Sequence, residues 1–247
     1  MRPHSNRFDA STWLTFLTLA VSVTAAGEPA SLPTGYKLLY DQKCNQAAAL
    51  KDFVLTDPGA WRFSKDDSGP ALELFQQSDY SPAVRSPLNI ALIADKIFGD
   101  FILEADLLST KEPYPHQDMC LFFGVRDPTH FYYVHLAVAA DPHAHNVFIV
   151  NNQPRLAIAK QTTKGITWGL SQWRHAKLER KFSDGSIKVY FDDMTKPIMT
   201  AEDRNFAAGY IGFGSFDDIG KVRNIRVWGP SVETKKTQFF ARPEAAR

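Results

Sequence analysis

The chain has 247 residues, of which 28 are basic and 27 acidic, so its formal net charge at pH 7 is +1. This balance leaves no overall positive charge that would draw the protein to nucleic acid or to an anionic membrane, and we expect neither as a partner. Without its N-terminal segment the chain keeps about 220 residues, which suits one sizeable all-β domain better than two small domains.

The N-terminus has the features of an export signal. Arg2 and Arg7 precede an uncharged, mostly apolar run over residues 10–23, and three small residues follow this run. The run is too short to span a bilayer comfortably, and the small residues suit a signal peptidase. We predict a signal peptide over residues 1–26 and a leader over 27–35, with a retained N-terminal anchor as the alternative. No later segment is apolar for long enough to be a membrane helix, so we expect a secreted, periplasmic or cell-surface protein with no integral span in its mature chain.

Export would permit a disulfide between Cys44 and Cys120, the two cysteines of the chain. Cys120 lies in an apolar run, where a buried free thiol is equally plausible. The pairing stays open, because a sequence does not give the distance between the two residues.

Short segments with the apolar pattern of β-strands, separated by turn residues, follow one another along most of the chain. The clearest hairpin has its tight turn at Asp184-Gly185, and residues 45–52 could form one helical turn. These segments predict one all-β sandwich or barrel over residues 36–229, followed by a flexible C-terminal tail over 230–247. The predicted strands are 61–64, 71–76, 89–92, 100–109, 120–126, 131–137, 146–151, 155–159, 175–182, 187–191, 198–201, 209–215 and 222–228.

Four segments carry a resemblance to a known fold: DFVLTDPGAWRF at 52–63, SPLNIALIADKIFGDFILEADLLST at 86–110, WRHAKLERKFSDGSIKVYFDD at 173–193, and GYIGFGSFDDIGKVRNIRVWG at 209–229. Together they resemble a concanavalin A-like jelly roll, the sandwich of lectins and glucanases. The closer resemblance is to laminin-G-like domains and to the 3-keto-disaccharide hydrolase-like domains of environmental bacteria. These motifs are structural and recur across many activities, so the resemblance implies the fold more strongly than the chemistry.

Family-16 glucanases of this fold carry two glutamates around an aspartate on one strand. The nearest phrase here contains Glu104 and Asp106, which share one face of a predicted strand, but Ser109 replaces the third acid. We expect these two carboxylates to lie on an outer, solvated face rather than to form the active site of a retaining glucanase.

Alternation in the predicted strand 131–137 places Tyr133 and His135 together on the face opposite Tyr132, Val134 and Leu136. We expect that face to be a concave surface where an aromatic ring packs on a sugar and polar side chains bind its hydroxyl groups. Each of these polar residues could instead bind a loop backbone. The predicted saccharide-binding residues are Arg85, Tyr133, His135, His143, Asn146, Asn151 and Arg155.

Five of the seven histidines lie between His116 and His145. In an extended loop His143 and His145 point the same way, so with Asp141 they could bind zinc or another transition metal. The alternative cofactor is calcium, bound by Asp127, by Asp141 or by the Asp217-Asp218 pair. A purely structural role for these histidines is the simpler alternative, and no cofactor is certain.

Three functions remain open from the sequence. The protein could be a secreted module that recognises a saccharide or glycan without cleaving it. It could be an enzyme resembling the 3-keto-glycoside-cleaving group, in which His135 or His145 acts as the catalytic base. It could also serve adhesion or bind a protein partner, as laminin-G-like domains do. Saccharide binding is shared by the first two, and whether the protein is an enzyme is left undecided.

Overall fold

The computed structural model describes residues 32–243, and the predicted signal peptide and most of the leader lie outside the described residues. The chain separates into two units, residues 1–32 and residues 33–247, and the fold below is that of the second unit. Among the described residues, no helix has the length and apolar character needed to cross a membrane.

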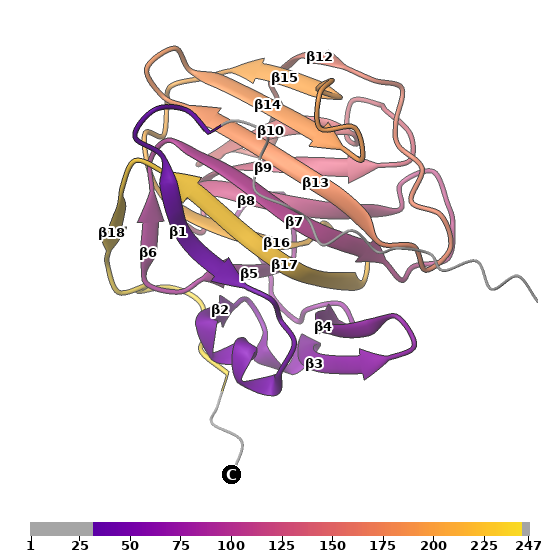
Figure 1. The fold of residues 1–247 in the computed structure, drawn as a ribbon. Helices are drawn as coiled ribbons and strands as arrows, with labels where there is room; N and C mark the ends of the chain where they lie inside the picture. Colours follow the sequence, from indigo (N-terminus) through magenta and orange to yellow (C-terminus); the bar gives the residue numbers. More distant parts are fainter. Residues whose placement is uncertain (1–31, 244–247) are drawn as a thin grey trace, which may run out of the picture. The chain divides into compact units, whose positions relative to one another are not determined.

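Two antiparallel sheets, here named sheet A and sheet B, pack face to face (Figure 1). Sheet A runs in the order β12-β15-β14-β13-β7-β17-β4-β3, with β1 paired to β17, and sheet B runs in the order β11-β10-β9-β8-β16-β5-β2. Strands far apart in the chain are therefore neighbours, as in β7 beside β17 and β5 beside β16. The all-β sandwich predicted from the sequence is confirmed.

The strands of sheet A are β1 (Lys37–Gln42), β3 (Trp61–Asp66), β4 (Gly69–Leu74), β7 (Phe101–Ser109), β12 (Ala159–Thr162), β13 (Arg174–Lys181), β14 (Ser186–Phe191), β15 (Met199–Glu202) and β17 (Gly220–Gly229). The strands of sheet B are β2 (Phe53–Leu55), β5 (Asn89–Ile93), β8 (Asp118–Asp127), β9 (His130–Ala137), β10 (Asn146–Asn151), β11 (Leu156–Ala157) and β16 (Tyr210–Ser215). The remaining elements are a ribbon of β6 (Lys96–Phe98) and β18 (Val232–Thr234), and two short 3-10 helices, η1 (Ala47–Asp52) and η2 (Pro58–Ala60).

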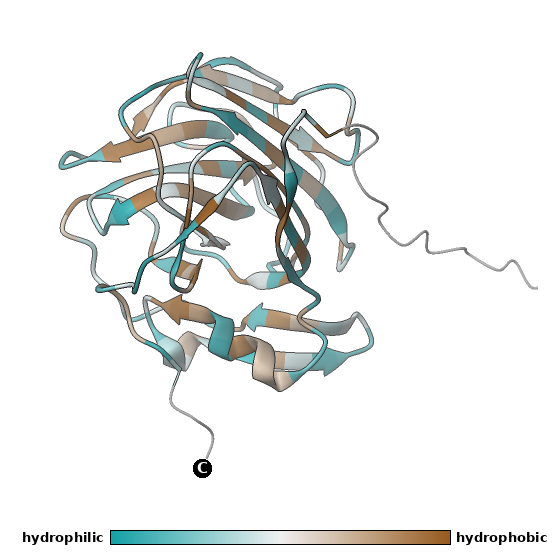
Figure 2. Ribbon diagram, turned by 60° about the vertical axis from the view of Figure 1, so that its left-hand side comes forward, coloured by the Kyte–Doolittle hydropathy of each residue, from teal (hydrophilic) through white to brown (hydrophobic). Residues whose placement is uncertain are grey.

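The main core fills the space between the two sheets, and Figure 2 shows hydrophobic and hydrophilic residues alternating along several strands. In β7, Leu103, Ala105 and Leu107 point into this core while Glu104 and Asp106 point outward, because successive side chains of a strand face opposite sides. The alternation that the sequence shows is thus the direct cause of the layered packing.

A second apolar cluster, here called the outer cluster, lies on the other face of sheet B. Strands β8, β9 and β10 are therefore buried on both faces, which explains why they are apolar over nearly their whole length. The buried members of the outer cluster are Val54, Ile90, Leu92, Cys120, Phe122, Val125, Phe131, Tyr133, Phe148, Val150 and Tyr210.

The C-terminal segment corrects the expectation of a loose tail after residue 229. Strand β18 pairs with β6, Ala241 forms a bridge with Leu55, and Phe239 and Phe240 pack against the outer cluster. The segment lacks the periodicity of a strand because its aromatic side chains contact the outer cluster at isolated positions. Residues 244–247 lie outside the described part of the chain.

The two cysteines are both buried and both free. Cys44 belongs to the main core and Cys120 to the outer cluster, so opposite faces of sheet B separate them. The sequence left open a disulfide or buried free thiols, and in the structure both thiols are free.

Gly214 lies in β16 between β5 and β8, where a side chain has no space. A Cβ atom there would stand 1.9 Å from the carbonyl oxygen of Asn89, which belongs to the backbone of β5 and cannot move aside alone. We expect Gly214→Ala to destabilise the fold by about 3 kcal/mol, at the upper end of overpacking effects, in urea unfolding experiments.

Gly99→Ala is the matched control. The nearest atom to a Cβ at Gly99 is 4.0 Å away, so this variant should unfold within ~0.5 kcal/mol of the wild type. Equal stability of the two alanine variants would contradict the close approach of β5 and β16.

Candidate functional site

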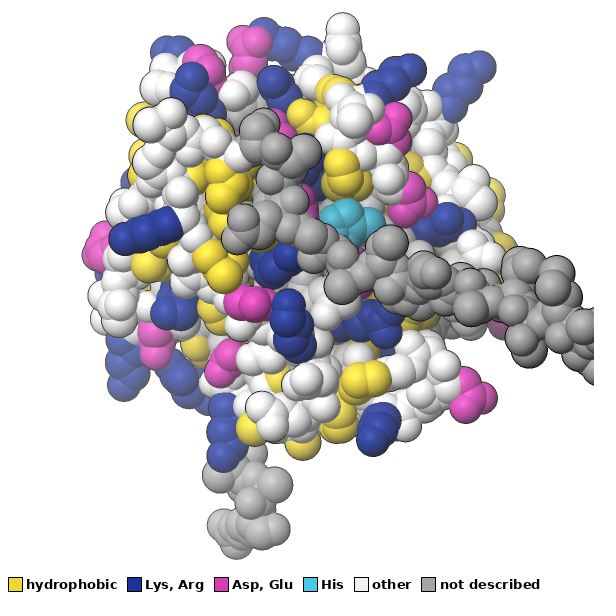
Figure 3. Space-filling view, viewed as in Figure 1, with side chains coloured by type: hydrophobic (Ala, Val, Ile, Leu, Met, Phe, Trp, Pro, Cys, Tyr) yellow, Lys and Arg dark blue, Asp and Glu magenta, His cyan; other side chains and the backbone are white. Residues whose placement is uncertain are grey.

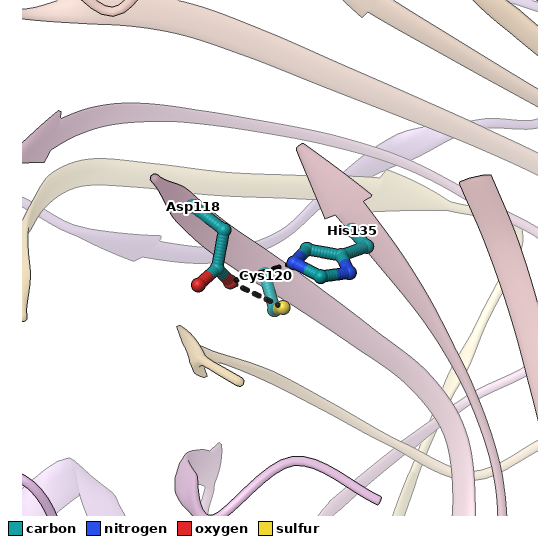
Figure 4. Close-up of side chains that lie close together, drawn as sticks. All are labelled: Asp118, Cys120 and His135. Atoms are coloured by element: carbon teal, nitrogen blue, oxygen red, sulfur yellow. Dashed lines mark hydrogen bonds and ion pairs between the residues drawn. The ribbon is translucent and has the colours of Figure 1, made fainter. Parts of the chain in front are cut away.

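Three chemically active side chains lie together on the outer face of sheet B (Figure 4). Asp118 and Cys120 alternate along β8, and His135 of β9 is paired directly with Cys120. The carboxylate, the thiol and the imidazole are all buried, and His135 is only 4% exposed. The pairing of β8 with β9 therefore brings the three side chains together.

Asp118 is the most deeply buried member and its carboxylate accepts several hydrogen bonds. Oδ1 accepts from Ser215 Oγ at 2.8 Å, and Oδ2 accepts from the Phe216 amide at 2.9 Å and from Cys120 Sγ at 3.1 Å. Burial by itself raises the pKa of Asp118, but the electrostatic interaction with His135, followed by the Phe216 and Cys120 hydrogen bonds, lowers it overall. The group is therefore a buried carboxylate. Burial and the negative charge of Asp118 raise the pKa of Cys120 well above its usual value, so its thiol stays protonated.

His135 is fixed from both sides of its ring. Nδ1 lies 3.2 Å from the carbonyl oxygen of His143, and Nε2 lies 3.4 Å from Asp118 Oδ2 without forming a hydrogen bond to any described residue. The ring stacks on Phe216, with centroids 6.0 Å apart and an angle of 18° between the planes. Its orientation is thus determined by β8, by the 138–145 connection and by the segment after β16.

Arg155 and Tyr133 lie next to this group. The Arg155 guanidinium carbon is 3.9 Å from the centroid of Phe216 and 5.2 Å from that of Phe148, while Tyr133 stacks on Phe148. Tyr133 Oη and the Nε and Nη1 atoms of Arg155 are buried and form no hydrogen bond with the described residues. Such groups are rare in folded proteins and are usually satisfied by water or a ligand.

Two further carboxylates border the group. Asp218 is buried, and its Oδ2 accepts from Tyr114 Oη at 2.9 Å and from the Asp118 amide at 3.0 Å. Burial and then the charge of Asp118 raise the pKa of Asp218 to about 6, and the same two causes raise the pKa of the exposed Asp217. A concentration of negative charge therefore surrounds Asp118, and Lys111 Nζ lies 3.7 Å from Asp218 Oδ1. We call Tyr133, His135, Asn146, Arg155, Phe216 and Asp217 the His135 site.

The structure places Tyr133 and His135 on one face of β9, as alternation predicts, but corrects the expectation of an open concave surface. Tyr133 is 0% exposed, because the outer cluster and the segments that cover it pack on this face of sheet B. Asn146 is paired with His135 across β9 and β10, is half-buried, and accepts a hydrogen bond from the Ala159 amide through Oδ1. The site thus reaches the surface only along its rim.

The predicted metal ligands Asp141, His143 and His145 do not gather. Asp141 accepts from the His143 amide and pairs with His116, while the His143 side chain is exposed. His145 is buried and its Nε2 contacts Thr163 Oγ1 at 2.9 Å, and burial, helped by the charge of His135, lowers its pKa to about 4. A positive φ of 50° at His145 turns its side chain away from the direction expected for an extended loop.

Three other predicted residues lie apart from the His135 side chain. Arg85 is exposed, although its carbonyl oxygen accepts from the Arg155 amide at 3.1 Å. Asn151 is exposed at the far end of β10, where it is paired with His130. Asp127 is occupied by Thr129 and His130 at the β8–β9 turn, so it is a turn-stabilising carboxylate here.

Glu104 and Asp106 are not the solvated carboxylates expected from the sequence. Both project from the outer face of sheet A, which Figure 3 shows as a surface of mixed basic and acidic side chains. Asp106 Oδ1 contacts His175 Nδ1 at 2.8 Å, and Glu104 Oε2 lies 3.3 Å from Arg226 and 3.4 Å from His175. Neighbouring strands β13 and β17 supply these partners, which sequence reasoning along β7 alone does not reveal.

Sequence reasoning missed Phe216 of the His135 site, and it missed Asp118 and Cys120, which contact His135 from β8. One local signal was available: Asp118 opens an otherwise apolar strand and alternates with Cys120, so both must share a face. Phe216 follows β16, and nothing near it in the sequence indicates His135 as its neighbour.

A surface cavity of about 410 Å³ lies elsewhere, between the end of β8, the start of β16 and the C-terminal segment. Arg126, Tyr210 and Lys235 are among its lining residues. It contains none of the residues that converge on His135, so we distinguish it from the His135 site.

Comparison with solved structures identifies the fold. The carbohydrate binding module CBM66 from Bacillus subtilis is 18% identical, with 74% of this chain and 96% of that chain covered and a TM-score of 0.52. A Bacillus subtilis protein of unknown function with a galectin-like fold is 16% identical, with 81% and 100% covered and a TM-score of 0.54. Peanut lectin with a nine-residue peptide is 10% identical, with 81% and 99% covered and a TM-score of 0.50. No protein-family model and no curated protein matches the sequence. The protein is a lectin-like jelly-roll β-sandwich.

The contacts of His175 with Asp106 and Glu104 make the stability of the fold depend on pH. Burial acts to lower the pKa of His175, but its bonds to Asp106 and Glu104 outweigh burial and raise the pKa from 6.5 to about 9. A histidine whose pKa is raised by folding stabilises the protein fully below the unfolded value, and this stabilisation is lost as the pH rises through the folded value.

We expect the wild type to lose roughly 1–3 kcal/mol of unfolding free energy between pH 6.5 and pH 9, while His175→Gln shows no such loss. Urea unfolding at both ends of this window measures the difference. The same slope in both proteins would refute the contribution of His175.

Proposed function

We propose that this protein binds a saccharide at the His135 site without cleaving it. The observation that carries the proposal is the convergence of buried polar atoms that have no described partner: Tyr133 Oη and Arg155 Nε and Nη1. Each such group costs about 1–3 kcal/mol when left unsatisfied, so a ligand that supplies partners gains affinity there.

The chemistry of the site suits the hydroxyl groups of a sugar. Arg155 offers several donors in a fixed plane, Tyr133 offers a hydroxyl group, and the exposed Asp217 offers acceptor oxygens at the rim. Phe216 packs against both Arg155 and His135 but is only half-buried, so the part of its ring that stays exposed can contact the apolar face of a sugar ring. The rim is where the ligand would enter, because Asn146, Arg155 and Phe216 are half-buried there.

The fold supports the proposal as well. CBM66 from Bacillus subtilis is named a carbohydrate binding module, and peanut lectin is named a lectin. Identities of 18% and 10% carry over the fold and no residue roles, so the support is for the kind of ligand rather than for the position of the site. The proposal includes export, which rests on the predicted signal of residues 1–26.

The geometry gives no support to cleavage by the two predicted catalytic histidines. Both ring nitrogens of His135 face protein atoms, and the Nε2 atom of His145 is occupied by Thr163. A catalytic base must come within hydrogen-bond reach of the substrate proton, which neither ring does in this structure. We therefore propose saccharide recognition rather than cleavage of a 3-keto-glycoside.

A glycan array, followed by calorimetric titration with the best oligosaccharide, tests the proposal. We expect Arg155→Gln to weaken binding by about tenfold or more, because hydrogen bonds from a charged donor contribute ~1.5–3 kcal/mol. Tyr133→Phe removes one hydroxyl group from the same stacked ring and should weaken binding less.

Arg126→Gln is the matched control, since Arg126 also lies over a phenylalanine ring, that of Phe206, but lines the separate 410 Å³ cavity. It should bind the oligosaccharide like the wild type. Loss of binding in Arg126→Gln with full binding in Arg155→Gln would place the ligand in the other cavity and refute this site. Absence of binding to any glycan would refute the proposed function.

A further inference from the structure

The contacts of His135 leave one of its ring nitrogens in an unfavourable position. Nδ1 faces the His143 carbonyl, which can only accept, so Nδ1 carries the hydrogen atom. In a neutral imidazole Nε2 then presents a lone pair, and this lone pair faces the Asp118 carboxylate at 3.4 Å. Two acceptors opposed in a buried place repel each other, so the pair needs a positive charge between them, either a second proton on the imidazole or a metal ion in its place.

Cys120 adds a third potential ligand atom at the same place. Its Sγ lies 3.1 Å from Asp118 Oδ2, and one atom each from Asp118, Cys120 and His135 lie within 4.8 Å of one another. A tetrahedral metal ion with bonds of ~2.0–2.3 Å to O, N and S sets its ligands roughly 3.3–3.8 Å apart. The distances from Asp118 Oδ2 to Cys120 Sγ and to His135 Nε2, 3.1 Å and 3.4 Å, are close to this spacing, so small side-chain shifts would complete the geometry.

The surroundings favour a cation as well. Asp118 is also within 4.8 Å of ligand atoms of Asp217 and Asp218, so three carboxylates crowd this region. The carbonyl partner of His135 Nδ1 is the arrangement that metal-binding histidines use to direct the other nitrogen at the ion. Asp118 keeps its bonds to Ser215 and Phe216 in this arrangement, because a carboxylate has further lone pairs to offer.

We propose that Asp118, Cys120 and His135 bind one transition-metal ion of the zinc class at the base of the His135 site. Cys120 binds as the thiolate and releases its proton to solvent when the metal enters. One thiolate, one imidazole and one carboxylate suit zinc or cobalt better than calcium or magnesium, which prefer oxygen ligands. The ion would lock β8 to β9 behind Tyr133 and Arg155, and its presence is independent of whether a saccharide binds.

The test uses the full-length protein stripped with a chelator and then titrated with Zn²⁺ or Co²⁺ in the absence of saccharide. We expect one equivalent of metal per chain by elemental analysis, an increase of several degrees in the unfolding temperature, and a thiolate-to-cobalt charge-transfer band in the near ultraviolet. Cys120→Ser should lose the band and bind Zn²⁺ about 100-fold more weakly.

Cys44→Ser is the matched control, because Cys44 is the other buried free thiol and lies in the main core. It should keep the charge-transfer band. A wild-type protein that binds no stoichiometric metal and unfolds at the same temperature with and without Zn²⁺ would overturn the proposal, whatever the variants do. A band that persists in Cys120→Ser would overturn it too. Arg155 is not one of the proposed metal ligands. Arg155→Gln should therefore bind Zn²⁺ like the wild type, even if it loses saccharide binding.

Discussion

The buried carboxylate of Asp118 connects the segments on which the His135 site depends. It accepts hydrogen bonds from Ser215 at the end of β16, from the Phe216 amide and from Cys120, while its own amide donates to Asp218. Breaking such a network would leave a charged group buried without partners, which destabilises proteins strongly. The position of Phe216 over His135, and of Arg155 over Phe216, follows from these bonds.

A second constraint is the apolar layer on the outer face of sheet B. In this chain the face is covered by its own aromatic cluster and by the C-terminal residues Phe239 and Phe240. Closure of the face converts what would be an open platform into a site that reaches solvent only at a rim. The same closure lowers the local dielectric constant, so the few polar groups left inside interact more strongly with whatever binds them.

The outer face of sheet A is built differently, since it is polar and its charges are paired. Glu104 and Asp106 of β7 contact His175 and Arg226 from the two neighbouring strands. These residues stabilise the sheet through ion pairs and give the fold a pH-dependent component. Their carboxylates are occupied by protein partners, which separates this face from the unsatisfied groups on sheet B.

Most of the longer strands, their alternation and the shared face of Tyr133 and His135 could be predicted from the sequence, because the period of two is a property of each strand alone. The short or edge strands β1, β2, β6 and β18 were missed. The register that puts Asn146 beside His135 joins strands that are adjacent in the chain, so it was within reach as well. The burial of that face could not be predicted. It depends on several segments that pack against the outer cluster, among them Phe216 and residues 239–240, and the last two carry no strand pattern of their own.

The sequence by itself therefore determined the sandwich and half of the candidate site, through local alternation and turn chemistry. Only the tertiary structure decided that Asp118 and Ser215, 97 residues apart, share a hydrogen bond and bring Phe216 onto His135. It also decided that His143 and His145 point to different surroundings, because one positive φ at His145 reverses the direction of its side chain. Contacts between distant strands and the conformation of single loop residues are set by the whole fold, and no local pattern in the chain records them.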